Sequence, residues 1–183
     1  LVMRKQLKFF TVSDSEGRLE PHFLGIRDGV SKEQRNVEAG FKNVLEARFR
    51  DAIFFFTRDL AVPFDEFAGK IKNITFQEKL GSMREKTERV KKLAFWLCDT
   101  CGSPVNKEEV VTASGYVYAD LVSNVVREFT ELQGSMGYYY AANAGLSETV
   151  SRAIGEFYWP LSAKSPLPSS IEGALVSMAG KLD

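Results

Sequence analysis

Apolar side chains recur every three or four residues over most of this chain, which is the spacing that gathers them on one face of an α-helix. Two segments near the start differ, because residues 5–12 and 22–26 are extended runs separated by the turn-forming residues 13–17, and they predict a β-hairpin. From residue 64 onward we expect only helices. The helices predicted from the spacing cover residues 33–60, 64–74, 82–98 and 147–158, a stretch from about residue 106, and a last segment from Ser169.

The stretch from Ala119 to Ala142 has a well-defined apolar stripe, and we expect the rest of the chain to pack around it as a helix. Gly134 and Gly137 relax the helical pattern before three tyrosines, which either pack in the core or stack on nucleic-acid bases. Asp120 is predicted on the polar face, with Asn124, Arg127 and Glu131. The stripe consists of Tyr118, Leu121, Val122, Val125, Val126 and Phe129.

Several helix ends have local signals. Ser82 and Glu85 have the spacing of a capping box, in which each side chain bonds the other residue's backbone N–H, and Ser169 and Glu172 repeat that spacing. Pro63 is expected to end the helix over residues 33–60. The predicted organisation is therefore a β-containing segment with a long connecting helix in residues 1–62, followed by a helical domain in residues 63–183.

Charge is balanced overall but uneven along the chain. The 183 residues contain 24 lysines and arginines and 24 aspartates and glutamates, so whole-chain charge does not predict a partner. Residues 69–92, however, contain eight basic and three acidic side chains, a net of +5, whereas residues 119–183 contain four basic and seven acidic ones, a net of −3. The basic run is either a solvated helix face with charge pairs or a surface that attracts a polyanion.

The sequence lacks the residues that several kinds of catalytic and metal-binding site require. The chain has one histidine, His22, and no phosphate-binding glycine loop, serine elbow or zinc-binding helix. Cys98 and Cys101 have the spacing of a redox pair or half a zinc site, but the alternative that we favour is two free thiols. No apolar run approaches the ~20 residues of a membrane helix, and the first residues do not resemble a signal peptide, so we expect a cytoplasmic protein without a membrane partner.

Four stretches resemble the β subunit of the bacterial, heterotetrameric type of glycyl-tRNA synthetase. They occur in the family's order with nearly the family's spacing, and the resemblance extends over nearly the whole chain. They are Met3-Arg4 with Lys8-Phe9-Phe10; residues 43–49 (NVLEARF) with Asp51-Ala52 and Phe54-Phe55-Phe56; residues 76–82 (FQEKLGS) with residues 86–89 (KTER); and residues 119–122 (ADLV) through Glu128-Phe129, residues 131–134 (ELQG), Met136-Gly137 and residues 139–141 (YYA).

The resemblance implies a central piece of a longer subunit of a class II aminoacyl-tRNA synthetase, a ligase of protein biosynthesis. It implies that a short β-containing segment, the end of an α/β domain, precedes an HD-domain-like helical bundle, so the expected fold is mainly α. It also implies two partners, the synthetase α subunit and glycine tRNA. In this family the α subunit uses ATP and magnesium to charge glycine, and the β subunit binds tRNA, so no cofactor is expected here.

An active HD phosphohydrolase is the alternative, and a helical scaffold unrelated to tRNA is a third possibility. HD enzymes hold metal through separated histidines, a His-Asp pair and a late aspartate; here Ala119-Asp120 occupies the pair and Gly180 replaces the late aspartate. We therefore predict no catalytic residue and no metal ligand. Tyr118 and Tyr138 stand where relatives commonly have lysine and arginine. The residues predicted to contact nucleic acid are Arg84, Lys86, Arg89 and Lys92.

Overall fold

A computed structural model describes residues 2–29, 33–102 and 104–183. The described part of the chain divides into two compact units, one ending at Thr57 and the other running from Arg58 to Asp183. Within the described residues, no helix combines the length and apolar character needed to cross a membrane. The domain division between residues 62 and 63 stays a prediction.

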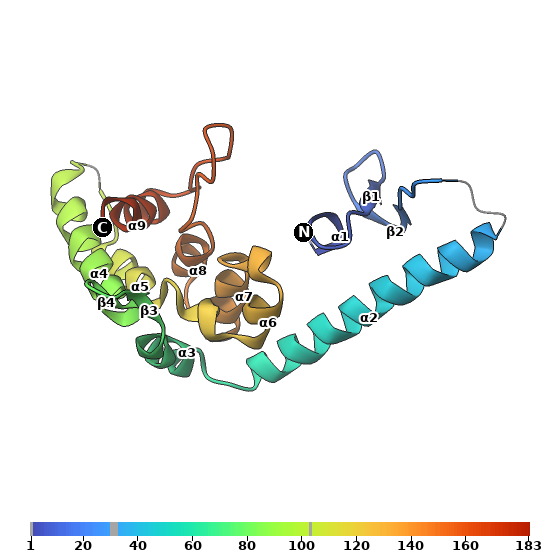
Figure 1. Cartoon of the computed structure of the whole chain (residues 1–183). Coiled ribbons are helices and arrows are strands. Elements are labelled where there is room, and N and C mark those ends of the chain that lie inside the picture. Colours follow the sequence, from blue (N-terminus) through green and yellow to red (C-terminus); the bar gives the residue numbers. More distant parts are fainter. Residues whose placement is uncertain (1, 30–32, 103) are drawn as a thin grey trace. The chain divides into compact units, whose positions relative to one another are not determined.

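The first unit contains a short helix, a hairpin and most of a long helix (Figure 1). Strands β1 (Phe10–Ser13) and β2 (Leu19–Leu24) pair antiparallel after helix α1 (Val2–Lys5), which confirms the predicted hairpin but moves its first strand several residues along the chain. Helix α2 (Gln34–Leu60) has nearly the predicted bounds. The ring of Phe9 lies 4.8 Å from that of Phe23 and 5.2 Å from that of Phe41, so three aromatic rings join the hairpin to the first turns of α2.

The second unit is mainly helical, as predicted (Figure 1). Helix α4 (Met83–Thr100) packs against α5 (Lys107–Tyr116) and α9 (Ile171–Leu182), and α8 (Glu148–Gly155) packs against α5, α7 (Ser135–Asn143) and α9. The residues at these contacts are small or β-branched, and Val90, Ala94, Val110, Ala113, Ala153, Val176 and Ala179 are fully buried. The elements are α3 (Phe64–Lys70), η1 (Ile71–Asn73), β3 (Thr75–Gln77), β4 (Gly81–Ser82), α4 (Met83–Thr100), α5 (Lys107–Tyr116), η2 (Ala119–Val122), α6 (Asn124–Glu128), η3 (Thr130–Leu132), α7 (Ser135–Asn143), α8 (Glu148–Gly155) and α9 (Ile171–Leu182).

The predicted continuous helix over residues 119–142 is wrong. The chain there forms η2, α6, η3 and α7, because Tyr118 and Gly134 have positive φ values of 68° and 81° and Ser123 has an extended backbone that caps α6. The stripe nevertheless marks the core, since Tyr118, Val125, Val126 and Phe129 are all buried. Asp120 is buried as well, so its predicted place on a polar face is also wrong.

Two further predictions need correction. The segment from residue 64 onward is not entirely helical, because β3 and β4 form a two-stranded hairpin between η1 and α4. The last helix is capped by Ser170, whose hydroxyl accepts a hydrogen bond from the Gly173 N–H, and not by Ser169. Ser169 instead donates its N–H and its hydroxyl to the Glu156 carboxylate.

Candidate nucleic-acid interface

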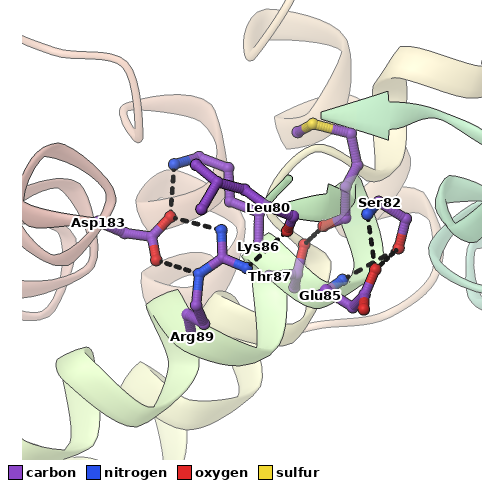
Figure 2. Close-up of polar contacts among 8 residues, drawn as sticks. Leu80, Ser82, Glu85, Lys86, Thr87, Arg89 and Asp183 are labelled. Carbon is purple, nitrogen blue, oxygen red and sulfur yellow. Dashed lines mark hydrogen bonds and ion pairs between the residues drawn. The ribbon is translucent and has the colours of Figure 1, made fainter. Parts of the chain in front are cut away.

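Helix α4, which carries all four predicted nucleic-acid contacts, begins with the predicted capping box. The Ser82 hydroxyl accepts a hydrogen bond from the Glu85 N–H at 3.3 Å, and the Glu85 carboxylate accepts one from the Ser82 N–H at 2.6 Å (Figure 2). The hydrogen bonds from the Ser82 backbone and hydroxyl hold the pKa of Glu85 below its usual value. Gly81, with φ of +84°, precedes the cap, and a Cβ there would lie 2.2 Å from the Glu85 carboxylate. The start of α4 is therefore firmly defined.

Two of the four predicted cations converge on one carboxylate at the end of α9. Lys86 Nζ lies 2.7 Å from Asp183 Oδ2, and Arg89 contacts both carboxylate oxygens, with Nε 2.6 Å from Oδ1 and Nη2 3.1 Å from Oδ2 (Figure 2). The Lys86 and Asp183 side chains are only 10% and 5% exposed. Burial raises the pKa of Asp183, but the hydrogen bonds from Arg89 and Lys86 outweigh it and leave the pKa below its usual value. These three residues, here called the α4–α9 clamp, join two helices.

The same cations also secure the β3–β4 hairpin. Arg89 donates from Nη1 to the Leu80 carbonyl oxygen at 3.1 Å, and Lys86 Nζ lies 4.4 Å from the centre of the Phe76 ring. A cation over an aromatic face is attracted by the negative potential of the ring. Lys86 and Arg89 are therefore occupied by contacts within the unit, on the side of α4 that meets the hairpin and α9.

The other two predicted cations point away from the clamp. Arg84 is exposed and pairs with Glu88 one turn later, at 2.9 Å, in a contact where both side chains are close to half exposed. Lys92 is exposed, and in the described ranges it has no ion-pair partner. The structure thus divides the predicted set into an inward pair and an outward pair. Contact of any of the four with nucleic acid stays a prediction.

Sequence reasoning missed the role of Asp183. Lys86 and Asp183 are 97 positions apart, and hydrophobic spacing carries no information about such a pairing. An aspartate in a predicted helix gives only a weak signal, because a buried carboxylate is stabilised by a cation but the sequence does not say which cation lies near it. In this unit two cations supply that stabilisation.

Asp120, the residue that would belong to an HD metal site, is buried, and its carboxylate accepts hydrogen bonds from backbone N–H groups. Its Oδ2 accepts hydrogen bonds from the N–H groups of Gly134 at 2.6 Å and Gly137 at 3.2 Å, at the start of α7. Burial raises the pKa of Asp120 to about 6, although these hydrogen bonds oppose the rise. A side chain at Gly137 would meet Ile154 at 2.8 Å, so this glycine allows the close approach of α7 and α8. The arrangement anchors a helix.

At Gly180, where HD enzymes have their late aspartate, the ring of Phe157 occupies the space that a side chain would need. A Cβ at Gly180 would lie 2.3 Å from Cζ of Phe157, so a side chain there requires Phe157 to move. Among the described residues, no three histidine, cysteine, aspartate or glutamate side chains gather in a way that could hold a metal ion. The residues present therefore do not fit an HD metal centre. The prediction that the chain binds no metal awaits direct metal analysis.

A second buried aspartate, also missed from the sequence, links the end of α2 to the start of α6. Asp59 is 1% exposed, and its carboxylate accepts hydrogen bonds from the Asn124 N–H at 3.0 Å, the Asn124 amide at 2.7 Å and the Val125 N–H at 2.9 Å. Tyr140 donates its hydroxyl at 2.8 Å. A carboxylate that accepts several donors at a helix start is well compensated for its burial.

The remaining candidates from the sequence have separate surroundings. Of the three tyrosines, Tyr140 is buried and Tyr139 is 56% exposed, so they do not form one stacking surface. Cys98 is a buried free thiol whose pKa is raised by burial, and Cys101 is an exposed free thiol. His22 is exposed on β2. None of these residues contributes to the surface of α4 that carries Arg84 and Lys92.

Comparison with known proteins supplies the family. The family described as "Glycyl-tRNA synthetase beta subunit" matches residues 1–183. The chain is 40% identical over 182 residues to a glycine–tRNA ligase beta subunit of Listeria monocytogenes, 41% over 185 residues to that of Lactobacillus helveticus, and 39% over 181 residues to that of Azotobacter vinelandii. Each match covers 99% of this chain and 26% of the relative, so the chain spans about a quarter of these relatives' length. The chain belongs to the glycyl-tRNA synthetase beta subunit family.

Proposed function

We propose that this chain is a tRNA-binding and assembly part of a glycine–tRNA ligase, with no catalytic centre of its own. Membership of the beta subunit family supports the enzyme, because the relatives are named as subunits of this ligase. The geometry around Asp120 and Gly180 supports a non-catalytic role, because one carboxylate is committed to backbone groups and the second is absent.

The observation that carries tRNA binding is the outward half of α4. Arg84 and Lys92 are exposed on a segment, residues 69–92, that has a net charge of +5 in a neutral chain. Each phosphate neutralised by such a cation releases a condensed counterion, which favours binding and makes it dependent on salt. Lys86 and Arg89 contribute in this proposal by holding α4 in place, since their charges are shared with Asp183.

The partners of the proposed enzyme are the α subunit, which would hold ATP and magnesium, and glycine tRNA. The two kinds of subunit would form a cytoplasmic heterotetramer. In this arrangement the HD-like helical unit has lost the metal site of HD enzymes and supplies a surface to a catalytic centre on another chain.

Charge reversal tests the RNA surface. The complete β subunit carrying Arg84→Glu and Lys92→Glu, assembled with the α subunit, should bind glycine tRNA more weakly, with a shallower dependence of log K on log salt. Losing two phosphate contacts reduces that slope by about 1.4 to 1.8. Arg127→Glu with Lys164→Glu is the matched control, because both residues are exposed in the same unit but lie outside the basic segment.

Glycylation by the unaltered complex tests the enzyme. A mixture of complete α and β subunits should charge tRNA with glycine from ATP, measured by acid-precipitable labelled glycine. If that mixture is inactive with active α subunit present, the ligase assignment fails. If it is active while the α4 reversal leaves tRNA binding and its salt slope unchanged, the ligase stands, and α4 is a solvated surface.

A further inference from the structure

Two large aromatic side chains lie exposed near the C-terminal end of α4. Phe95 is 49% exposed and Trp96 is 58% exposed, while Val90, Ala94 and Leu97 on the other side of the same helix are buried. The described residues give Trp96 no ring contact and no side-chain hydrogen bond. The helix therefore exposes an indole that the core of this unit does not use.

Positive charge lies close to these rings, and part of it is unpaired. Lys91 and Lys92 precede Phe95 and Trp96 by one helical turn, and neither lysine has an ion-pair partner in the part of the chain that the structure describes. Lys107, from the start of α5, lies with Nζ 5.6 Å from the centre of the Phe95 ring. Glu88 is paired with Arg84, and Asp99, one turn after Phe95, is paired with Lys107, so the unpaired charge beside the rings comes from Lys91 and Lys92. A ligand here would meet aromatic faces and free lysines together.

We propose that Phe95 and Trp96 form a stacking platform for unpaired bases of an RNA strand whose phosphates lie on Lys91 and Lys92. A double helix would use the lysines but not the rings, because its bases are already stacked inside. Unpaired bases expose their faces, and stacking on tryptophan or phenylalanine is a general mode of single-strand binding. The proposal rests on the tRNA-binding function above and deepens it, because it names the unpaired segments of the RNA as the ligand of this surface.

A second exposed aromatic group of the unit, around Tyr139, is less suited to RNA. Tyr139 lines a shallow cavity of about 290 Å³ together with Tyr138, Trp159, Arg152 and Glu156. Arg152 is paired with Glu148 at 2.5 Å, and Tyr138 donates to the same carboxylate group. The cavity therefore offers no free cation to a phosphate, whereas the α4 platform offers two. Tyr139, with an exposure close to that of Trp96, is a matched control for the experiment.

The test uses the complete β subunit and two probes of equal charge, a twelve-residue oligoadenylate and a twelve-residue abasic ribose-phosphate oligomer. Trp96→Ala should weaken oligoadenylate binding between about 5-fold and 150-fold, the range for removing one stacking residue. Binding of the abasic oligomer should not change. Trp96→Phe should restore most of the oligoadenylate affinity, Lys92→Gln should weaken both probes, and Tyr139→Ala should weaken neither.

The outcomes separate this inference from the proposed function. If Trp96→Ala leaves oligoadenylate binding unchanged while Arg84→Glu with Lys92→Glu weakens tRNA binding, the platform is refuted and the proposed function stands. If Trp96→Ala abolishes association with the α subunit and leaves RNA binding intact, the platform is a protein interface and the inference is also overturned. If the oligoadenylate responses are as expected but the complex fails to charge tRNA, the platform stands and the ligase assignment falls. Thermal melting of each variant confirms an unchanged fold, which the exposure of Trp96 predicts.

Discussion

Replacing Asp183 by asparagine keeps the shape of the side chain but removes the charge that holds the α4–α9 clamp. Lys86 would then be a nearly buried ammonium, 10% exposed, whose counter-ion is gone. Arg89, 37% exposed, can turn toward water at less cost. Because an unpaired charge is far more costly inside a protein than at its surface, we expect most of the loss of stability to come from Lys86.

The size of the effect follows from burial. Removing one partner of a fully buried ion pair costs about 3–5 kcal/mol. The remaining exposure of Arg89 and the amide oxygen of the new asparagine reduce this, so we expect about 2–4 kcal/mol for Asp183→Asn, which corresponds to a fall of roughly 5–15 °C in Tm for a chain of this size. Lys86→Met should cost less, about 1 kcal/mol, because Arg89 still neutralises Asp183 and an apolar side chain suits the site.

Urea denaturation followed by circular dichroism measures these free energies of unfolding in the 183-residue chain. Arg84→Gln is the control, since it breaks an exposed pair and should cost less than about 0.5 kcal/mol. The pKa of Asp183 in the folded state lies below its unfolded value of about 3.9, so the clamp stabilises above that pH and is lost as pH falls through the folded pKa. The difference between the unaltered chain and Asp183→Asn should therefore shrink below about pH 4. A loss under 1 kcal/mol at pH 7 would refute the clamp.

Three further outcomes are expected. Burial raises the pKa of Asp120 to about 6, so the contribution of this residue to stability is greatest below the unfolded pKa of about 3.9 and falls as the pH rises toward 6. Asp120→Asn should remove this pH dependence, which is worth about 3 kcal/mol and can be measured by urea titrations between pH 4 and 7. Tyr140→Phe removes one donor to the buried Asp59 carboxylate and should lower the free energy of unfolding by about 1–3 kcal/mol, and an unchanged value would show that the three amide donors suffice. Plasma mass spectrometry of the purified chain should find iron, manganese and zinc well below one equivalent, whereas a stoichiometric metal would revive the HD phosphohydrolase alternative.

Local chemistry determined how much of this fold could be predicted. The cap at Ser82 and the end of α2 before Pro63 depend on residues within one or two turns, so their sequence signals were sufficient. The same reasoning wrongly predicted one helix over residues 119–142, because the apolar spacing indicates which residues are buried but not the backbone conformation that buries them. The positive φ of Tyr118 interrupts the helix there, and a tyrosine in the sequence does not indicate a left-handed backbone conformation.

Long-range partners were out of reach for a different reason. Asp183 is bound by residues of α4 and Asp59 by groups of α6 and α7, each more than 60 positions away in sequence. Charge counting located the basic segment, but it could not tell which of its cations were already neutralised. Hydrophobic spacing also could not identify Trp96 as exposed, since an aromatic residue on an amphipathic helix is usually assigned to the core.

Helix α4 is therefore best understood as two faces with different tasks. Its inner face buries Val90 and Ala94 and sends Lys86 and Arg89 to Asp183, which fixes the helix against α9 and the β3–β4 hairpin. Its outer face is then held rigidly, and ligands bind a rigid surface at a lower entropic cost than a flexible one. This separation predicts two different results. Lys86→Met should reduce stability with little change in the salt slope of RNA binding. Lys92→Gln should make the salt slope of RNA binding shallower with little change in stability. A single variant that changed both quantities equally would show that the two faces are not independent.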